Sequence, residues 1–130
     1  MDDTSMNTLI KSHLESLRHA ESREMYMRTL HACEDRPGGL AITDLDMIFD
    51  LCCTEDMKQE LRKDIADRGV MVEVRNGRQL FRKENPSLAR AQRCSEYQRK
   101  LRADLRLTPL KRLGPEKDAP DNPEDEFDLL

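Results

Sequence analysis

Apolar side chains in the first part of the sequence recur at helical spacing, which predicts an amphipathic helix that ends before Pro37. The apolar stripe comprises Met6, Leu9, Ile10, His13, Leu14, Leu17, Ala20 and Met27. Ser5 is the expected N-cap, and proline disfavours a helical conformation in the residue that precedes it. Such a stripe needs a covering surface, and packing within the chain and a subunit interface both remain open.

A second helix is predicted to begin at Thr43, whose hydroxyl can accept a hydrogen bond from the backbone of Asp46. Gly69 should end it, because glycine enters the left-handed region without a Cβ penalty. Its apolar positions are Leu45, Phe49, Cys53, Met57, Leu61 and Ile65. A four-residue spacing drifts by about 40° per step around a helix of 3.6 residues per turn. We therefore expect either different neighbours at the two ends of the helix or a break near residues 52–54.

Beyond this helix the apolar period changes from 3.6 to 2, which predicts a two-stranded β-hairpin. Its alternating apolar positions are Val70, Val72 and Val74. The Asn76-Gly77 pair is the expected turn, so that Arg75 pairs with Arg78 and Val72 lies opposite Phe81. Two strands alone are only marginally stable in water, so the hairpin should pack on a helix or join hairpins from other copies of the chain.

Asn85 and Pro86 predict the start of a third helix, since asparagine is a good N-cap and proline suits the first helical position. The helix should run to about Leu107, because Thr108-Pro109 follows. Its apolar face comprises Ala91, Cys94, Tyr97, Leu101 and Leu105. Arginine and lysine flank that face on both sides, so the helix presents basic surfaces beside its core-facing stripe.

The composition is typical of one small domain with a lean core. Of 130 residues, 37% are hydrophobic and 37% are charged, and only five side chains are aromatic. The expected fold class is mainly α with one β-hairpin: a single helical domain over residues 1–113, with the hairpin at about 70–83, and an acidic disordered tail over 114–130. No apolar run exceeds three residues, so neither a membrane span, which needs about 20, nor an export signal is expected.

The net charge of −4 conceals a strong segregation of charge along the chain. Residues 68–113 carry a net +9, whereas residues 41–67 carry −5 and residues 114–130 carry −6. A cationic block of this density indicates either a surface for a polyanion or charge pairing between subunits.

The sequence offers no arrangement typical of an enzyme, so we assign no catalytic residue, metal ligand or cofactor. His31 and Cys33 are close together, but no paired CxxC or HxxxH element accompanies them. Gly38-Gly39 lacks the Lys-Ser/Thr of a phosphate-binding loop. His13 lies in the first apolar stripe, where a hydrogen-bonded core or interface histidine is expected. The four cysteines are expected to be reduced thiols.

Duplex DNA is the polyanion that fits the basic block, because Lys and Arg that neutralise phosphates release counterions. Single-stranded nucleic acid fits less well, since stacking needs exposed aromatic side chains and the block holds only Phe81 and Tyr97. The alternative is a solvated helix face, or pairing with the acidic 43–67 segment of a neighbouring subunit. The candidate DNA-binding residues are Arg75, Arg78, Arg82, Lys83, Arg90, Arg93, Arg99, Lys100, Arg102, Arg106, Lys111 and Arg112.

The acidic tail ends with three apolar residues, which resemble a short docking motif for a partner protein. These residues are Phe127, Leu129 and Leu130. Two alternatives stay open. The tail can be a solubilising acidic segment, or it can occupy the protein's own basic surface and suppress nonspecific DNA binding.

Several short motifs also occur in a characteristic order. They are Ile42-Thr43-Asp44-Leu45-Asp46, Gly69, Asn85-Pro86, Leu105-Arg106-Leu107-Thr108-Pro109 and Arg112. In this order they resemble the small terminase subunits of tailed bacteriophages and prophages, a family with Asn-Pro before its last helix and a Leu-Gly-Leu-Thr-Pro-x-x-Arg ending. The resemblance covers roughly residues 40–113. Arg106 stands where the family usually has Gly, and Leu110-Lys111 replace its usual small residues.

The resemblance implies a noncatalytic component of viral DNA packaging that acts in the cytoplasm of the bacterial host. Its expected partners are double-stranded viral DNA at the packaging site, further copies of itself in a ring-shaped homo-oligomer, and the large terminase subunit. The large subunit carries the ATPase and nuclease, and the tail is assigned to it as a hypothesis. Two other interpretations remain: a dimeric helix-turn-helix regulator that uses residues 6–67, and a protein-only adaptor with an acidic partner.

Overall fold

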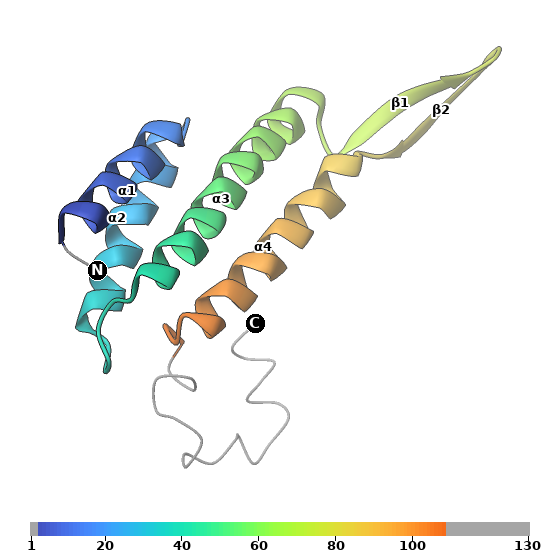
Figure 1. Cartoon of the computed structure of the whole chain (residues 1–130). Helices are drawn as coiled ribbons and strands as arrows, with labels where there is room; N and C mark the ends of the chain where they lie inside the picture. Colours follow the sequence, from blue (N-terminus) through green and yellow to red (C-terminus); the bar gives the residue numbers. More distant parts are fainter. Residues whose placement is uncertain (1–2, 109–130) are drawn as a thin grey trace, which may run out of the picture.

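The computed structural model describes residues 3–108 as a helical body with a projecting hairpin (Figure 1). The elements are α1 (Asp3–Ser16), α2 (Ala20–Asp35), α3 (Ile42–Arg68), β1 (Met71–Asn76), β2 (Gln79–Glu84) and α4 (Pro86–Asp104). In Figure 1, α3 and α4 lie side by side in opposite directions, α1 and α2 cover the other side of α3, and the hairpin extends beyond the helices. The expected mainly helical fold with one hairpin is confirmed.

The core lies where α2, α3 and the end of α4 meet. Its fully buried side chains include Tyr26 from α2, Leu45 and Ile48 from α3, and Leu105 at the end of α4. The apolar residues of α1 cover this core, with Leu14 and others only partly buried. The core is therefore small, as the scarcity of aromatic residues predicts.

The prediction of one continuous N-terminal helix is wrong, because the chain breaks at residues 17–19 between α1 and α2. The Asp56 carboxylate on α3 accepts hydrogen bonds from the backbone N–H groups of Arg18 (2.9 Å) and His19 (3.0 Å). Arg23 Nη1 donates to the carbonyl of Leu17 (2.8 Å), on the other side of the break. Contacts from distant residues therefore stabilise a turn that helical periodicity does not reveal.

This break changes which side chains the N-terminal segment buries. Ala20 and Met27 are exposed, contrary to the predicted stripe, whereas Met25 and Tyr26 are buried from α2. Ser5 lies inside α1 and so is not its N-cap. A helical wheel that continues from α1 through the turn therefore assigns the wrong residues to the buried face of α2.

The α3 helix has different neighbours along its length, as one of the two alternatives predicted, and no break near residues 52–54. It begins at Ile42, so Thr43 is not the N-cap, and the Asp44 carboxylate accepts the N–H of Ala41 (2.8 Å). The buried positions are Leu45, Ile48, Leu51, Cys52, Glu55 and Asp56. Because two of them are carboxylates, the apolar spacing alone places the buried face wrongly, and Met57 is 57% exposed.

The hairpin forms in a register that differs from the predicted one. Asn76 pairs with Gln79, and Val72 lies opposite Lys83 rather than Phe81. The two central turn residues are Gly77, with φ +64°, and Arg78, which has no positive φ. Positive φ at the first central position only is typical of a type II′ turn, which favours glycine there. The turn therefore sits one residue later than an Asn-Gly type I′ turn places it.

The start of α4 is confirmed. Asn85 Oδ1 accepts a hydrogen bond from the backbone N–H of Ser87 (3.0 Å), and Pro86 occupies the first helical position. Gly69 ends α3 with φ +89°, and its carbonyl accepts a hydrogen bond from Asn85 Nδ2 (3.0 Å). The cap of one helix is thus bonded to the end of the other.

The end of α4 differs from the prediction, because the helix stops at Asp104 rather than near Leu107. Arg106 adopts a left-handed conformation with φ +60°. Its N–H donates to Ala103 (3.0 Å), and the N–H of Leu107 donates to Arg102 (2.9 Å). These two hydrogen bonds define a Schellman motif with Arg106 at the position that glycine usually occupies.

The buried face of α4 also differs in one respect. Cys94, Leu101 and Leu105 are buried as expected, but Tyr97 is 45% exposed and Gln98 is fully buried in its place. Apolar periodicity does not predict a glutamine at a buried position. A buried glutamine needs a polar partner, which must lie on α3.

Candidate nucleic-acid interface

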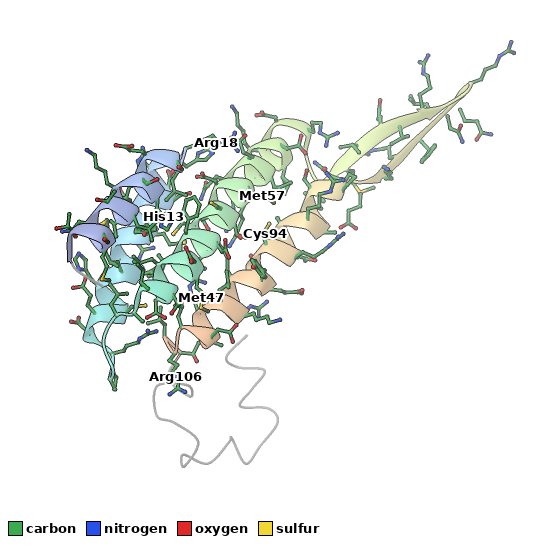
Figure 2. All side chains as sticks on the ribbon, viewed as in Figure 1. His13, Arg18, Met47, Met57, Cys94 and Arg106 are labelled. Atoms are coloured by element: carbon green, nitrogen blue, oxygen red, sulfur yellow. The ribbon has the colours of Figure 1, made fainter. Side chains whose placement is uncertain are left out.

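The cations predicted to contact DNA fall into two groups on consecutive elements. The hairpin carries Arg75, Arg78, Arg82 and Lys83, and α4 with its C-terminal turn carries Arg90, Arg93, Arg99, Lys100, Arg102 and Arg106. Lys111 and Arg112 lie outside the described residues, as do Phe127, Leu129 and Leu130. Figure 2 shows Arg106 at the end of α4 that is remote from the hairpin, so the two groups lie along one elongated arm.

The arm is long compared with a compact binding patch. The 19 residues of α4 span about 28 Å at 1.5 Å per residue. The hairpin strands of 6 residues add about 20 Å at 3.3 Å per residue. In the sequence these residues form one basic block, and the structure spreads that block along the length of α4 and the hairpin.

The cations of this arm are available to a ligand. Nine of the ten side chains are exposed, and Arg102 is half-buried, with Nη2 3.9 Å from Met25 Sδ. Among residues 3–108, none of the ten forms an ion pair with a carboxylate, although Arg36 pairs with Asp44 and Arg68 pairs with Asp64. The positive charge of the arm is therefore not cancelled by direct pairing within the described chain.

A buried polar network fixes α4 on α3 and so determines which way its cations point. Gln98 Nε2 donates to Glu55 Oε1 (2.9 Å) and to the carbonyl of Leu51 (3.3 Å). Gln98 Oε1 accepts a hydrogen bond from Lys58 Nζ (2.9 Å), and burial lowers the pKa of Lys58. Because a buried amide is costly without partners, rotation of α4 would break all three bonds. Sequence reasoning missed these residues, since it sought the interface among apolar positions.

A second network anchors the base of the hairpin. Arg68 donates to both oxygens of Asp64 (2.6 and 2.8 Å), and the Ser87 hydroxyl donates to Asp64 Oδ2 (2.6 Å). The hydrogen bonds from Arg68 and Ser87 hold the pKa of Asp64 well below its ordinary value. The N–H of Asn85 donates to the carbonyl of Val70 (2.7 Å), which joins the two strands where they meet the helices. The hairpin is thus fixed at its base while its strands project.

The surface between α3 and α4 holds a groove of about 470 Å³. Met57 and Leu61 line it from α3, and Arg90, Arg93 and Tyr97 line it from α4. Met57 and Tyr97 are about half exposed, so this groove has an uncovered apolar floor beside two guanidinium groups. Two of the predicted DNA contacts therefore also border an apolar site.

His13 and Cys52 are buried side chains of the helical body. His13 is buried, Nδ1 is hydrogen-bonded to the Tyr26 hydroxyl (2.8 Å), and its ring stacks on Phe49 with centroids 4.1 Å apart, as expected of a core histidine. Burial lowers the pKa of His13, and burial raises the pKa of the Cys52 thiol to about 12. Within residues 3–108, no three His, Cys, Asp or Glu side chains cluster closely enough to hold a metal ion. No helix in the same range is long and apolar enough to cross a membrane.

Comparison with known families decides the identity of the chain. Residues 22–121 match the family model of the phage terminase small subunit. The chain belongs to this family. The match includes most of α2 and all of α3, the hairpin and α4, which is a longer segment than the motifs alone indicate. No curated protein and no solved structure matches the chain. Membership in the terminase small-subunit family gives the protein a general role in phage DNA packaging.

Proposed function

We propose that this terminase small subunit binds double-stranded viral DNA through the arm formed by the hairpin and α4. The observation that carries the proposal is the set of ten cations along the arm without an ion-pair partner among residues 3–108. Arginine and lysine side chains that share one side of the arm can contact successive phosphates, and the release of counterions supplies the binding free energy. These contacts are to the DNA backbone, so this electrostatic part of the binding free energy needs no base-specific contact from a single subunit.

The proposal includes a ring-shaped homo-oligomer. Apolar side chains are exposed on the hairpin, namely Val70, Met71, Leu80 and Phe81. A two-stranded ribbon with exposed apolar groups and unpaired edges becomes more stable when it packs against another copy of the chain. Repetition of the basic arm around a closed ring multiplies weak phosphate contacts through avidity. Recognition of the packaging site would thus be a property of the assembly.

The proposal assigns catalysis to the partner. This chain would recruit and regulate the large terminase subunit in the cytoplasm of the bacterial host, and the large subunit would supply the ATPase and nuclease. Phe127, Leu129 and Leu130 are proposed to dock there, because they lie in an acidic segment that resembles a short linear motif. No cofactor is proposed for the small subunit.

DNA binding is tested by charge reversal on the two halves of the arm. One variant carries Arg75→Glu, Arg78→Glu and Arg82→Glu, and a second carries Arg93→Glu, Arg99→Glu and Lys100→Glu. The affinity for a duplex should fall, and the slope of log K against log salt should flatten by about one unit for each phosphate that the variant no longer neutralises. Fluorescence anisotropy with a labelled duplex over a salt series measures both quantities.

The matched control carries the same charge change outside the arm. Lys11→Glu, Arg28→Glu and Lys63→Glu alter exposed cations of α1, α2 and α3. This control should keep most of the affinity and the full salt slope. If the control and the arm variants lost equal affinity, the loss would reflect net charge alone and would not place the DNA site on the arm. Unaltered binding in both arm variants would move the DNA site to the N-terminal helices, and no binding by the wild type at low salt would favour a protein-only adaptor.

A further inference from the structure

The groove between α3 and α4 has the chemistry of a peptide site. Its floor is apolar, with Met57 at 57% and Tyr97 at 45% exposed, and Leu61 lies beside them. Arg90 and Arg93 line it, and no carboxylate is among the lining residues. A ligand that fits must therefore be both apolar and acidic.

The sequence of the chain itself contains such a segment. Residues 124–130 read Glu-Asp-Glu-Phe-Asp-Leu-Leu, with four carboxylates and three large apolar side chains. The carboxylates can pair with guanidinium groups of Arg90 and Arg93, while Phe127 and the leucines supply apolar area for the floor. Elsewhere along the chain, the acidic residues 41–67 belong to α3, which itself builds the groove.

The connecting length is sufficient for the segment to reach the groove from its own chain. Leu105 and Arg90 are fifteen residues apart in sequence, about 22 Å along the helix at 1.5 Å per residue. Residues 109–123 provide fifteen further residues, and a chain of this length spans up to about 50 Å when extended. The reach exceeds the distance, and a tethered ligand gains from a high effective concentration.

We infer that the α3–α4 groove binds the acidic segment 124–130 of this protein, with Phe127 on the floor beside Met57 and Tyr97. The site is a self-interaction surface that the family match does not assign. One consequence rests on the proposed function: the bound segment would cover Arg90 and Arg93 and so compete with DNA for them. It would also hold Phe127, Leu129 and Leu130 away from the large subunit until a partner displaces them.

Photo-crosslinking of the full chain in the absence of DNA tests the inference independently of DNA binding. With p-benzoylphenylalanine in place of Phe127, irradiation should attach residue 127 to peptides that contain Met57, Leu61 or Tyr97, as mapped by mass spectrometry. Arg90→Glu with Arg93→Glu should lower the yield about fivefold, which corresponds to about 1 kcal/mol for two exposed charge pairs. Arg75→Glu with Arg78→Glu has the same charge change on the hairpin and should leave the yield unchanged.

A photoreactive residue in the groove itself identifies which segment or partner occupies it. With p-benzoylphenylalanine in place of Met57, the expected adducts lie on residues 124–130. Adducts with the helices of a second copy, identified by mixing isotopically heavy and light chains, would make the groove a subunit interface and overturn the inference. Adducts from position 127 outside the groove, or an equal drop in yield in both charge-reversed variants, would also overturn it. A failure here leaves the DNA-binding proposal intact, because no DNA is present.

Discussion

Arg106 occupies a backbone conformation that suits a different residue. Its φ of +60° lies in the left-handed region, which costs an L-residue roughly 1–2 kcal/mol relative to glycine. The position closes the Schellman motif after α4, and the family pattern that this chain resembles has glycine there. The chain therefore keeps an arginine at some cost in stability, on the arm that we assign to DNA.

Replacement of this arginine should stabilise the isolated protein. Arg106→Gly removes the left-handed penalty, and part of the gain is offset by the greater freedom of glycine in the unfolded chain. We expect the free energy of unfolding to rise by about 1 kcal/mol, measured by urea denaturation without DNA. Arg99→Gly is the matched control, because the same charge is removed from the exposed interior of α4, where glycine should lower stability by about 1 kcal/mol. A neutral or destabilising Arg106→Gly would contradict the left-handed turn.

At the scale of elements, α3 organises the turn between α1 and α2. Burial raises the pKa of Asp56, but the hydrogen bonds that its carboxylate accepts, foremost the one from the backbone N–H of Arg18, outweigh burial, and the pKa of the folded state lies below the ordinary value. A lowered pKa means that the ionised form is favoured in the folded state. The stabilisation is present above the unfolded pKa of about 4 and is lost as the pH falls through the folded pKa.

The Asp56→Asn variant tests this role. Asparagine keeps the shape but offers one acceptor oxygen where the carboxylate offers two, so one partly buried N–H loses its partner. The free energy of unfolding at pH 7 should fall by about 1–3 kcal/mol. The difference from wild type should shrink as the pH is lowered below about 4, because the wild type then loses its own stabilisation. Asp50→Asn, an exposed carboxylate of the same helix, is the control and should change stability little. If the difference in the free energy of unfolding did not change with pH, the ionised Asp56 carboxylate would not be the group that stabilises the turn.

Elements that depend on local signals could be predicted from the sequence. Gly69, the Asn85-Pro86 cap and a glycine turn at residue 77 each act within a few residues, and all three are present. The break at residues 17–19 could not be predicted, because its acceptor, Asp56, lies 37 residues or more along the chain. The same reason applies to Gln98, whose partner Glu55 is 43 residues away. Apolar periodicity reports which residues avoid water and is silent about buried polar pairs.

At the scale of the whole molecule, the candidate cations could be named from sequence, but their arrangement could not. Counting charges along the sequence identifies the basic block. That the block forms one extended arm follows only from the structure, in which α4 packs antiparallel to α3 and the base of the hairpin is anchored (Figures 1 and 2). The groove was also beyond sequence reasoning, because Tyr97 was predicted to be buried with the core. Its exposure arises from Gln98, which takes the core-facing position.

The elongated arm leads to a prediction about assembly. Leu80 is 58% and Phe81 is 44% exposed on the projecting hairpin, so residues 3–108 leave about half of each side chain uncovered. We expect native mass spectrometry of the full chain to give a closed assembly well above four copies of 15.1 kDa. Leu80→Ser with Phe81→Ser should weaken each subunit interface about 100-fold, which corresponds to about 2–3 kcal/mol less apolar burial, and shift the mass to smaller species.

Met57→Ser with Tyr97→Ser is the matched control, because it removes similar exposed apolar area from the groove and not from the hairpin. If the hairpins hold the assembly together, this control keeps the wild-type mass, and circular dichroism should show both variants to be folded. A monomer or dimer of the wild type at micromolar concentration would contradict the ring and favour a dimeric regulator or an adaptor. Dissociation of the control alone would place the subunit interface on α3 and α4. The hairpin alone would then project from each subunit as a DNA-contacting extension.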